Sequence, residues 1–265
     1  MKRSIFTIII CLLTASAFAD GITDTTKTKV RTGITEDGPT FDLKYNRSTD
    51  SAKHASKAPG FSWNIVFSRF DLGLTTLVDN GSFRLSPQNQ FLRYRSWKSS
   101  NVGFDVIEFN YRFSSSFKIY LSGGFDWTLL RLRENVNILE NKPVLTYTEA
   151  NVDYSKNRFS SSYLRIPLSF DFRTKANANG DSWHFVFGPE GGILLDGMVK
   201  QISPEFGKVH YDNNYHFTKF RYGPFLRVGQ GDFGIFAKYY VNDMFQDSPE
   251  QKELKNFAFG FTLFF

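Results

Sequence analysis

The chain has 265 residues and is 41% hydrophobic, which is too little for a bundle of membrane-spanning helices. Its formal net charge is +6, but basic and acidic residues alternate along the whole chain and form no basic block. This distribution argues against a nucleic-acid partner, because nucleic-acid binding needs clustered lysine and arginine.

The first nineteen residues have the order of a secretory signal peptide. Two basic residues follow the initial methionine, residues 5–13 form a short apolar core, and Ala17-Phe18-Ala19 is an A-x-A site. We therefore expect export, with cleavage after Ala19. The alternative, a membrane anchor, is disfavoured because the apolar run is too short to span a bilayer. The single cysteine, Cys11, lies in this leader, so no disulfide is expected in the mature chain.

Residues 20–60 differ from the rest of the chain in composition. The segment is polar, rich in Thr, Ser, Asp and Lys, and shows no sustained alternation of apolar residues. These properties favour a disordered periplasmic N-terminal tail. A small plug, or a segment that contacts a periplasmic partner, is the alternative.

A different pattern begins at Phe61 and continues to the end of the chain. Apolar residues alternate with polar ones, which is the period of β-strands with two unlike faces. Turn-like sequence divides the region into eight segments. The connections between them alternate between long and short, as in transmembrane barrels, whose strand number is even. The predicted strands are Ser62–Leu77, Val102–Phe113, Phe117–Leu130, Arg158–Arg173, Ser182–Val199, Tyr215–Val228, Phe233–Phe245 and Leu254–Phe265.

Three features interrupt this pattern. The parity of the first strand reverses in its early half, which predicts a bulge near Ser68. Residues 91–97 are expected to extend a strand beyond the membrane. Pro167, Pro189 and Pro224 lie inside predicted strands, where proline cannot donate to the ladder, so we expect bulges or kinks there.

The last strand indicates which face meets which environment. Its even positions carry small side chains, Ala258, Gly260 and Thr262, which suit a crowded lumen, while its odd positions are large and apolar and suit lipid. A soluble sandwich or a lipocalin-like barrel would place the large residues inside instead. The pattern therefore predicts an all-β fold, a transmembrane antiparallel up-and-down β-barrel of about eight strands over residues 61–265. The apolar row consists of Phe257, Phe259, Phe261, Leu263 and Phe265.

The chain ends on an aromatic residue, and in this it resembles the outer-membrane β-barrel proteins of Gram-negative bacteria. Two runs, Tyr-Leu-Arg-Ile-Pro-Leu at residues 163–168 and Arg-Tyr-Gly-Pro at residues 221–224, look like the porin-family outer-membrane β-barrel domain, a family of small barrels. The resemblance implies a Gram-negative outer-membrane location, with outer-membrane lipids and the barrel assembly machinery as partners. It also implies that the last strand is the assembly signal, and that protein secretion is one candidate process.

The polar faces of the strands are expected to fill the lumen with charges. Eight strands enclose an interior only wide enough for side chains, so this row predicts an ionic plug. Nine basic residues face five acidic ones, so pairing alone is not expected to neutralise it, and some side chains should reach the rims or hold water or anions. The predicted lumen charge network is Arg69, Asp71, Glu108, Arg112, Lys118, Asp126, Arg165, Asp171, Arg173, Glu190, Lys219, Arg221, Arg227 and Lys238.

No residue pattern predicts catalysis, a cofactor or a metal. His210 and His216 lie six positions apart with Asp212 between them, but loop histidines of this kind are usually only solvated. His184 is expected on the lumen side without a nucleophile and an acid beside it. Residues 188–192 are glycine-rich, but they lie inside a strand and form no phosphate-binding loop.

The prediction for function is a non-enzymatic barrel, plugged by its lumenal charges, that acts as a scaffold, binding or assembly component. Partner recognition, including recognition of a protein, is expected at the long loops, residues 131–157 and 199–214, or at the tail. The alternatives are a narrow solute or ion channel of porin type, and an outer-membrane lipid-modifying enzyme.

Overall fold

The computed structural model describes residues 31–35, 38–42, 60–177 and 182–264. The chain divides into two units, Met1–Lys53 and His54–Phe265. In the first unit, β1 (Arg31–Thr35) and β2 (Gly38–Asp42) pair as an antiparallel hairpin. The predicted signal peptide, with Ala17 and Ala19, and most of the predicted tail lie outside the described residues. The disordered periplasmic tail over residues 20–60 stays a prediction.

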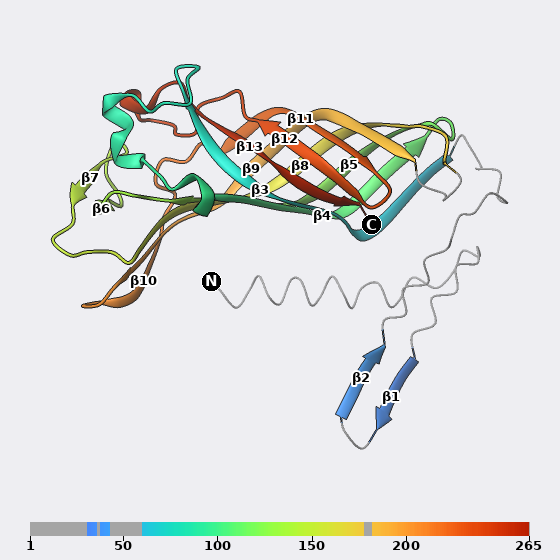
Figure 1. The fold of residues 1–265 in the computed structure, drawn as a ribbon, viewed down its shortest axis with the longest axis horizontal. Coiled ribbons are helices and arrows are strands. Elements are labelled where there is room, and N and C mark those ends of the chain that lie inside the picture. The colour runs from blue at the N-terminus through green and yellow to red at the C-terminus, as the bar shows by residue number, and fades with distance from the viewer. Residues whose placement is uncertain (1–30, 36–37, 43–59, 178–181, 265) are drawn as a thin grey trace. The chain divides into compact units, whose positions relative to one another are not determined.

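The second unit is a barrel of eight antiparallel strands (Figure 1). Each strand pairs with the next one in the chain, and the last strand pairs back with the first, which closes the ring. The predicted up-and-down barrel of eight strands is therefore confirmed. The barrel strands are β3 (Gly60–Asp79), β4 (Ser100–Arg112), β5 (Phe117–Arg131), β8 (Lys156–Arg173), β9 (Trp183–Ser203), β11 (Phe220–Gln230), β12 (Phe233–Tyr239) and β13 (Leu254–Phe264).

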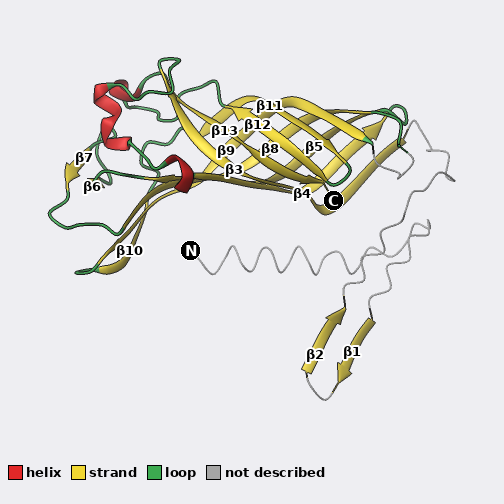
Figure 2. Ribbon diagram, in the orientation of Figure 1, coloured by secondary structure: helices red, strands yellow, loops and turns green. Residues whose placement is uncertain are grey.

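Short turns lie at one end of the barrel and the long connections at the other (Figure 2). The predicted strand over residues 91–97 is wrong, because this stretch contains the end of one 3-10 helix and the start of another, and only Tyr94 between them forms an isolated bridge, to Leu132. The sixth and seventh strands are also shorter than predicted, since β11 begins at Phe220 and β12 ends at Tyr239. No helix in the described ranges is long and apolar enough to cross a membrane. The long connections contain η1 (Pro87–Leu92), η2 (Ser96–Lys98), β6 (Val136–Ile138), β7 (Tyr147–Glu149), β10 (Gly207–Asp212) and η3 (Pro249–Gln251).

The two faces of each barrel strand meet different surroundings. In β13, Phe259 and Phe261 are exposed on the outer surface, whereas Ala258 and Thr262 are completely buried. The predicted orientation, with large apolar side chains outward and small or polar ones inward, is thus confirmed; Phe265 lies outside the described residues. Other exposed apolar side chains on the barrel wall are Phe109, Leu121, Ile166, Phe172, Phe185, Phe187, Ile193, Leu226 and Ile235.

Two bulges in the first half of the barrel decide which side chains point inward. The β3–β4 register shifts between Ile65 and Arg69, which confirms the bulge predicted near Ser68. The β4–β5 register shifts between Asp105 and Ile107, a bulge that was not predicted. Because a bulge inserts one residue, odd-numbered side chains that point outward on one side of it point inward on the other side.

The three strand prolines cause no register shift, so no bulge forms at them, and the alternative of a kink stays a prediction. Pro224 lies opposite Pro189 in an unbroken β11–β9 register. Strand β8 keeps one register with β5 and with β9 on both sides of Pro167, although both ladders omit pairs next to it. An antiparallel ladder alternates hydrogen-bonded and non-hydrogen-bonded pairs, so a proline fits without a shift where its missing N–H is not needed.

The long connections pack into an apolar core at their end of the barrel, which we call the apolar cap. Every long connection, with the strand ends beside it, contributes buried side chains to this core. The cap therefore lies over the lumen and is built mainly from segments outside the regular strand pattern. Its buried members are Leu77, Phe91, Leu92, Leu130, Leu132, Val136, Ile138, Leu145, Phe159, Val199, Tyr215, Phe217, Phe245 and Leu254.

Candidate functional site

The inward faces of the strands meet in one connected ion-pair network, and Asp71 of β3 lies at its centre. Arg165 Nη1 and Arg227 Nη2 lie 2.7 and 2.8 Å from Asp71 Oδ2. Lys238 Nζ lies 3.2 Å from the same oxygen, and Thr262 donates its hydroxyl to Oδ1 at 2.8 Å. None of these residues is more than 2% exposed, so basic groups rather than bulk water compensate the carboxylate charge.

A second carboxylate, Asp126 of β5, extends the network toward the long connections. Lys238 Nζ lies 2.7 Å from Asp126 Oδ2 and so bridges the two aspartates, while Arg221 forms an ion pair with Asp126. The Arg221 guanidinium lies over the rings of Tyr163 and Tyr240, at 3.8 and 4.1 Å from their centroids. Two such cation–π contacts fix the orientation of the guanidinium in a desolvated site.

A third carboxylate, Asp105 of β4, was missed by the sequence prediction. Arg165 Nη2 lies 2.7 Å from Asp105 Oδ1, and Arg69 Nε lies 3.1 Å from Oδ2. Arg69 also forms an ion pair with Glu108. Simple alternation from Glu108 places Asp105 on the lipid face, but the bulge at Val106 turns it inward. An acidic residue in an otherwise apolar outward row was the signal that could have revealed it.

The rims of the barrel hold the remaining predicted network residues. Lys118 and Arg173, partly exposed near the short turns, lie 3.6 and 3.1 Å from Asp171. Arg112 is half-buried at the end of β4. The prediction is wrong for Lys219, which is exposed because β11 begins only after it. The basic excess therefore lies at the rims, where water can solvate it.

The buried part of the network is close to neutral, which agrees with the expectation that some of the excess basic side chains reach the rims. Ten of the fourteen predicted residues are buried, and Asp105 joins them, which gives six carboxylates and five basic groups. One cavity above Arg221, lined also by Thr218 and Asn256, has a volume of only about 10 Å³. That is room for about one water molecule. The lumen is filled by paired side chains.

A serine, a histidine and an aspartate meet near the short-turn end of the lumen. His184 Nε2 lies 3.3 Å from Ser182 Oγ, and His184 Nδ1 lies 3.8 Å from Asp171 Oδ1. The second distance is too long for the hydrogen bond that orients the imidazole of a serine hydrolase. Asp171 instead accepts from Arg173 through its other oxygen. Within the described residues, no group of three His, Cys, Asp or Glu side chains is placed to hold a metal ion.

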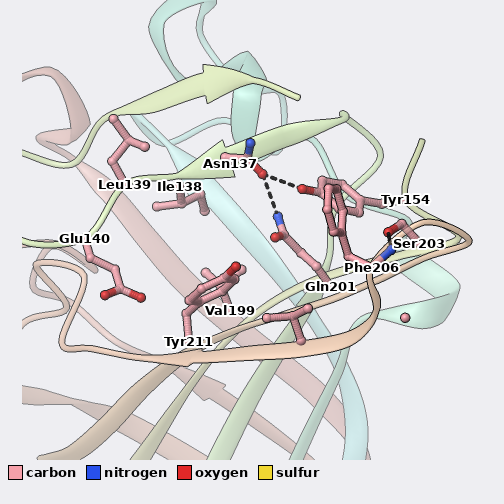
Figure 3. Close-up of a pocket in the computed structure, with 12 residues that line it drawn as sticks. Asn137, Ile138, Leu139, Glu140, Tyr154, Val199, Gln201, Ser203, Phe206 and Tyr211 are labelled. Carbon is pink, nitrogen blue, oxygen red and sulfur yellow. Dashed lines mark hydrogen bonds between the residues drawn. The ribbon is translucent and has the colours of Figure 1, made fainter. Parts of the chain in front are cut away.

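The long loops singled out by the sequence, residues 131–157 and 199–214, together line a groove of about 410 Å³ beside the cap (Figure 3). Gln201 Nε2 donates to Asn137 Oδ1 at 3.1 Å, and the Tyr154 hydroxyl donates to the same oxygen at 2.6 Å. The first bond joins the β9–β10 hairpin to β6, and the second holds Tyr154 to β6 within the loop of residues 131–157. The groove is thus a preformed surface rather than a gap between free loops.

Aromatic rings stand at both ends of this groove. Tyr154 and Phe206 lie together at one end, and Tyr211 lies at the other end beside Glu140 (Figure 3). Phe206 and Tyr211 are exposed. Burial and the nearby Glu140 raise the pKa of Tyr215, whose hydroxyl donates to that carboxylate at 3.1 Å. The arrangement offers apolar ring faces and hydrogen-bonding groups, but no catalytic set.

Comparison with known proteins gives one family match. The model of the outer membrane protein beta-barrel domain matches residues 55–242. Among solved structures, the chain is similar to Ail, the attachment invasion locus protein of Yersinia pestis, in complex with the heparin analogue sucrose octasulfate. That alignment has 15% identity and a TM-score of 0.31, and it covers 77% of this chain and 97% of Ail. A second Ail structure aligns with 12% identity, a TM-score of 0.28 and the same coverage. No curated protein matches the chain.

Proposed function

Because this chain belongs to the outer membrane protein beta-barrel domain family, we propose that it is a plugged outer-membrane barrel that binds a partner through its outer loops without catalysing a reaction. The family membership confirms the prediction of a small outer-membrane barrel. The cleaved leader, the closer relation to porins and the scaffold, assembly or secretion role remain predictions.

The observation that carries the proposal is the filled lumen. An open channel needs a continuous column of mobile water, whereas Arg165, Arg227 and Asp71 form a completely buried cluster across the barrel interior. The apolar cap then covers the network on the side of the long connections. Since transport through this lumen would require breaking buried ion pairs, the activity is assigned to the outer surface instead.

The groove supports a binding role for that surface. Transmembrane barrels of this class place short turns in the periplasm and long loops outside the cell. In that orientation the groove is accessible from outside, and the hydrogen bonds within and between its loops reduce the ordering cost of binding. A narrow channel and a lipid-modifying enzyme remain the alternatives.

Single-channel recording on the purified barrel tests the plug. We expect no stable conductance from the wild type, because buried ion pairs occupy the interior. Removing two cations from the network in Arg221→Ala/Lys238→Ala should open a leak, whereas Lys219→Ala/Lys252→Ala, at exposed positions, should not. Large, stable conductance steps recorded from the wild type would show that it is a channel and would contradict the plugged barrel.

The contact between Ser182 and His184 is the observation that favours the enzyme alternative. A phospholipid hydrolysis assay on the same preparation examines it. Activity that disappears in Ser182→Ala would replace the binding proposal with an enzymatic one. Equal hydrolytic activity in the wild type and in Ser182→Ala would instead come from a contaminant.

A further inference from the structure

A row of basic residues crosses four strands near the long-connection end of the barrel. Arg131 of β5 lies opposite Arg158 of β8. Arg158 lies opposite Lys200 of β9, which lies opposite His210 of β10. Residues directly opposite each other project from the same face of a sheet, with Cβ atoms about 4.5–5.5 Å apart. The register therefore places four basic side chains side by side.

A second row lies next to the first. Lys156 and Lys208 both lie opposite Ile202, one on each side of β9. Lys208 is exposed, and Lys156 is half-buried. We call the two rows together the basic strip, which consists of Arg131, Lys156, Arg158, Lys200, Lys208 and His210.

The basic strip faces away from the lumen and the groove. Asn157 and Phe159, on either side of Arg158 in the chain, are buried on the inner face. Val209 and Tyr211, on either side of His210, line the groove. Because side chains alternate along a strand, the strip lies on the outer wall.

This wall continues directly into the apolar belt of the barrel. On β5, Arg131 shares its face with Leu129, two residues earlier, which is about 7 Å along the strand. On β8, Ser160 and Ser162 lie on this face between Arg158 and Leu164, so the apolar side chains begin farther from the strip there, at Leu164 and the exposed Ile166. The polar headgroup layer adds roughly 5–7 Å on each side of the hydrocarbon core. The strip thus begins at the height of the lipid headgroups.

The bases of the strip are poorly balanced by acids on the same face. Like charges directly opposite in a sheet are destabilising. Burial and the neighbouring Lys200 and Lys208 lower the pKa of His210, although Asp212 acts in the other direction. Asp196 is the other carboxylate on this face of the β9–β10 region. The five lysine and arginine side chains of the strip share this face with two carboxylates, which leaves an excess of positive charge that an anion outside the protein can offset.

Protection of a sheet edge does not explain the strip. Lysines on edge strands discourage pairing with other chains, which could account for Lys208 and His210 on β10. Arg131, Arg158 and Lys200 lie on strands that have neighbours on both sides, where no such protection is needed.

We propose that the basic strip binds phosphate groups of the lipid headgroups in the outer leaflet around the barrel. Arginine forks pair with phosphate oxygens in two parallel hydrogen bonds, and lysine adds compact positive charge. This inference rests on the membrane barrel and does not depend on the proposed role of the groove.

Native mass spectrometry of the barrel in neutral detergent micelles tests the inference. The probes are diphosphoryl lipid A, its dephosphorylated form and soluble inorganic tripolyphosphate. The strip variant is Lys200→Gln/Lys208→Gln, and the matched control is Lys219→Gln/Lys252→Gln, which removes two lysines from other parts of the outer end. Heat-modifiable migration in gels confirms that each variant is folded.

We expect the wild type and the control to retain diphosphoryl lipid A equally and to release the dephosphorylated form. The strip variant should bind diphosphoryl lipid A about thirty-fold more weakly, from the usual contribution of two basic residues at an anionic surface. Equal retention by the strip variant and the wild type would overturn the site. If the wild type binds tripolyphosphate tightly but does not retain diphosphoryl lipid A, the claim that the ligand is a lipid is wrong, and the strip is a site for a soluble phosphate. If the double variant fails to fold, Lys208→Gln alone should weaken binding about five-fold.

Discussion

The lumen network and the apolar cap fill the same barrel in opposite ways. In the network, charged side chains from fixed strand positions pair across the interior, as Arg165 does with Asp71 and Asp105. In the cap, apolar side chains from irregular connections pack without ion pairs between its members, as Leu92, Phe217 and Phe245 do. Strand faces thus define the first region, and loop packing defines the second.

The network and the cap specify the fold in different ways. An ion pair that joins residues 94 positions apart, as Arg165 and Asp71 do, forms only when both strands are in register. The network can therefore reject slipped registers, which would leave charges unpaired in a dry interior. Apolar packing tolerates exchange among side chains of similar volume, so the cap needs enclosed volume more than exact register.

The largest expected effect comes from removing a cation at the centre of the network. Arg165→Met keeps much of the side-chain length but leaves Asp71 and Asp105 with fewer partners. We expect a loss of about 3–5 kcal/mol in the free energy of unfolding, because buried charges lose their compensation. Urea unfolding in lipid vesicles, followed by tryptophan fluorescence, measures it. The exposed Lys219→Met serves as the control, and equal stability of the two variants would contradict a structural role for the network.

A cavity in the cap should have a more local effect. Leu92→Ala removes a fully buried side chain and should weaken the cap by about 2–5 kcal/mol. Since the barrel ladder is untouched, we expect faster proteolysis within residues 132–155 while heat-modifiable migration persists. Val144→Ala, at a 42% exposed position of that loop, is the control. If Leu92→Ala abolishes barrel folding, the cap is not separable from the barrel.

The smallest expected effect comes from crowding the network without changing its charge. A Cβ on Gly103 would lie 2.8 Å from Asp126 Oδ2 and closer still to Arg165 Nη1. Gly103→Ala should therefore cost about 1–3 kcal/mol, the usual range for overpacking. Gly123→Ala on the adjacent strand meets only Ile107 Cγ2, at 3.0 Å, and should cost less. Equal unfolding midpoints for the two variants would show that the ion pairs can move aside.

The strands, and the side of each strand that meets lipid, could be predicted from local sequence patterns. Period-two alternation is a local property, so it located all eight barrel strands and placed Phe259 outside and Thr262 inside. The same parity identified ten buried network residues correctly. Alternation gives the wrong face beyond a bulge, where one strand has an extra residue. For this reason Asp105, beyond the bulge at Val106, was not predicted to point inward.

The pairing of residues in the network and the packing of the loops could not be predicted from the sequence. Which base meets which acid depends on the closure of the ring, and the pair of Arg227 and Asp71 is 156 residues apart in sequence. The cap and the groove use buried residues without a regular spacing, such as Leu132, Ile138 and Leu145, so no periodic pattern could reveal them. The basic strip likewise exists only because the registers of three strand pairs bring distant bases side by side, a long-range pairing that no local sequence signal encodes.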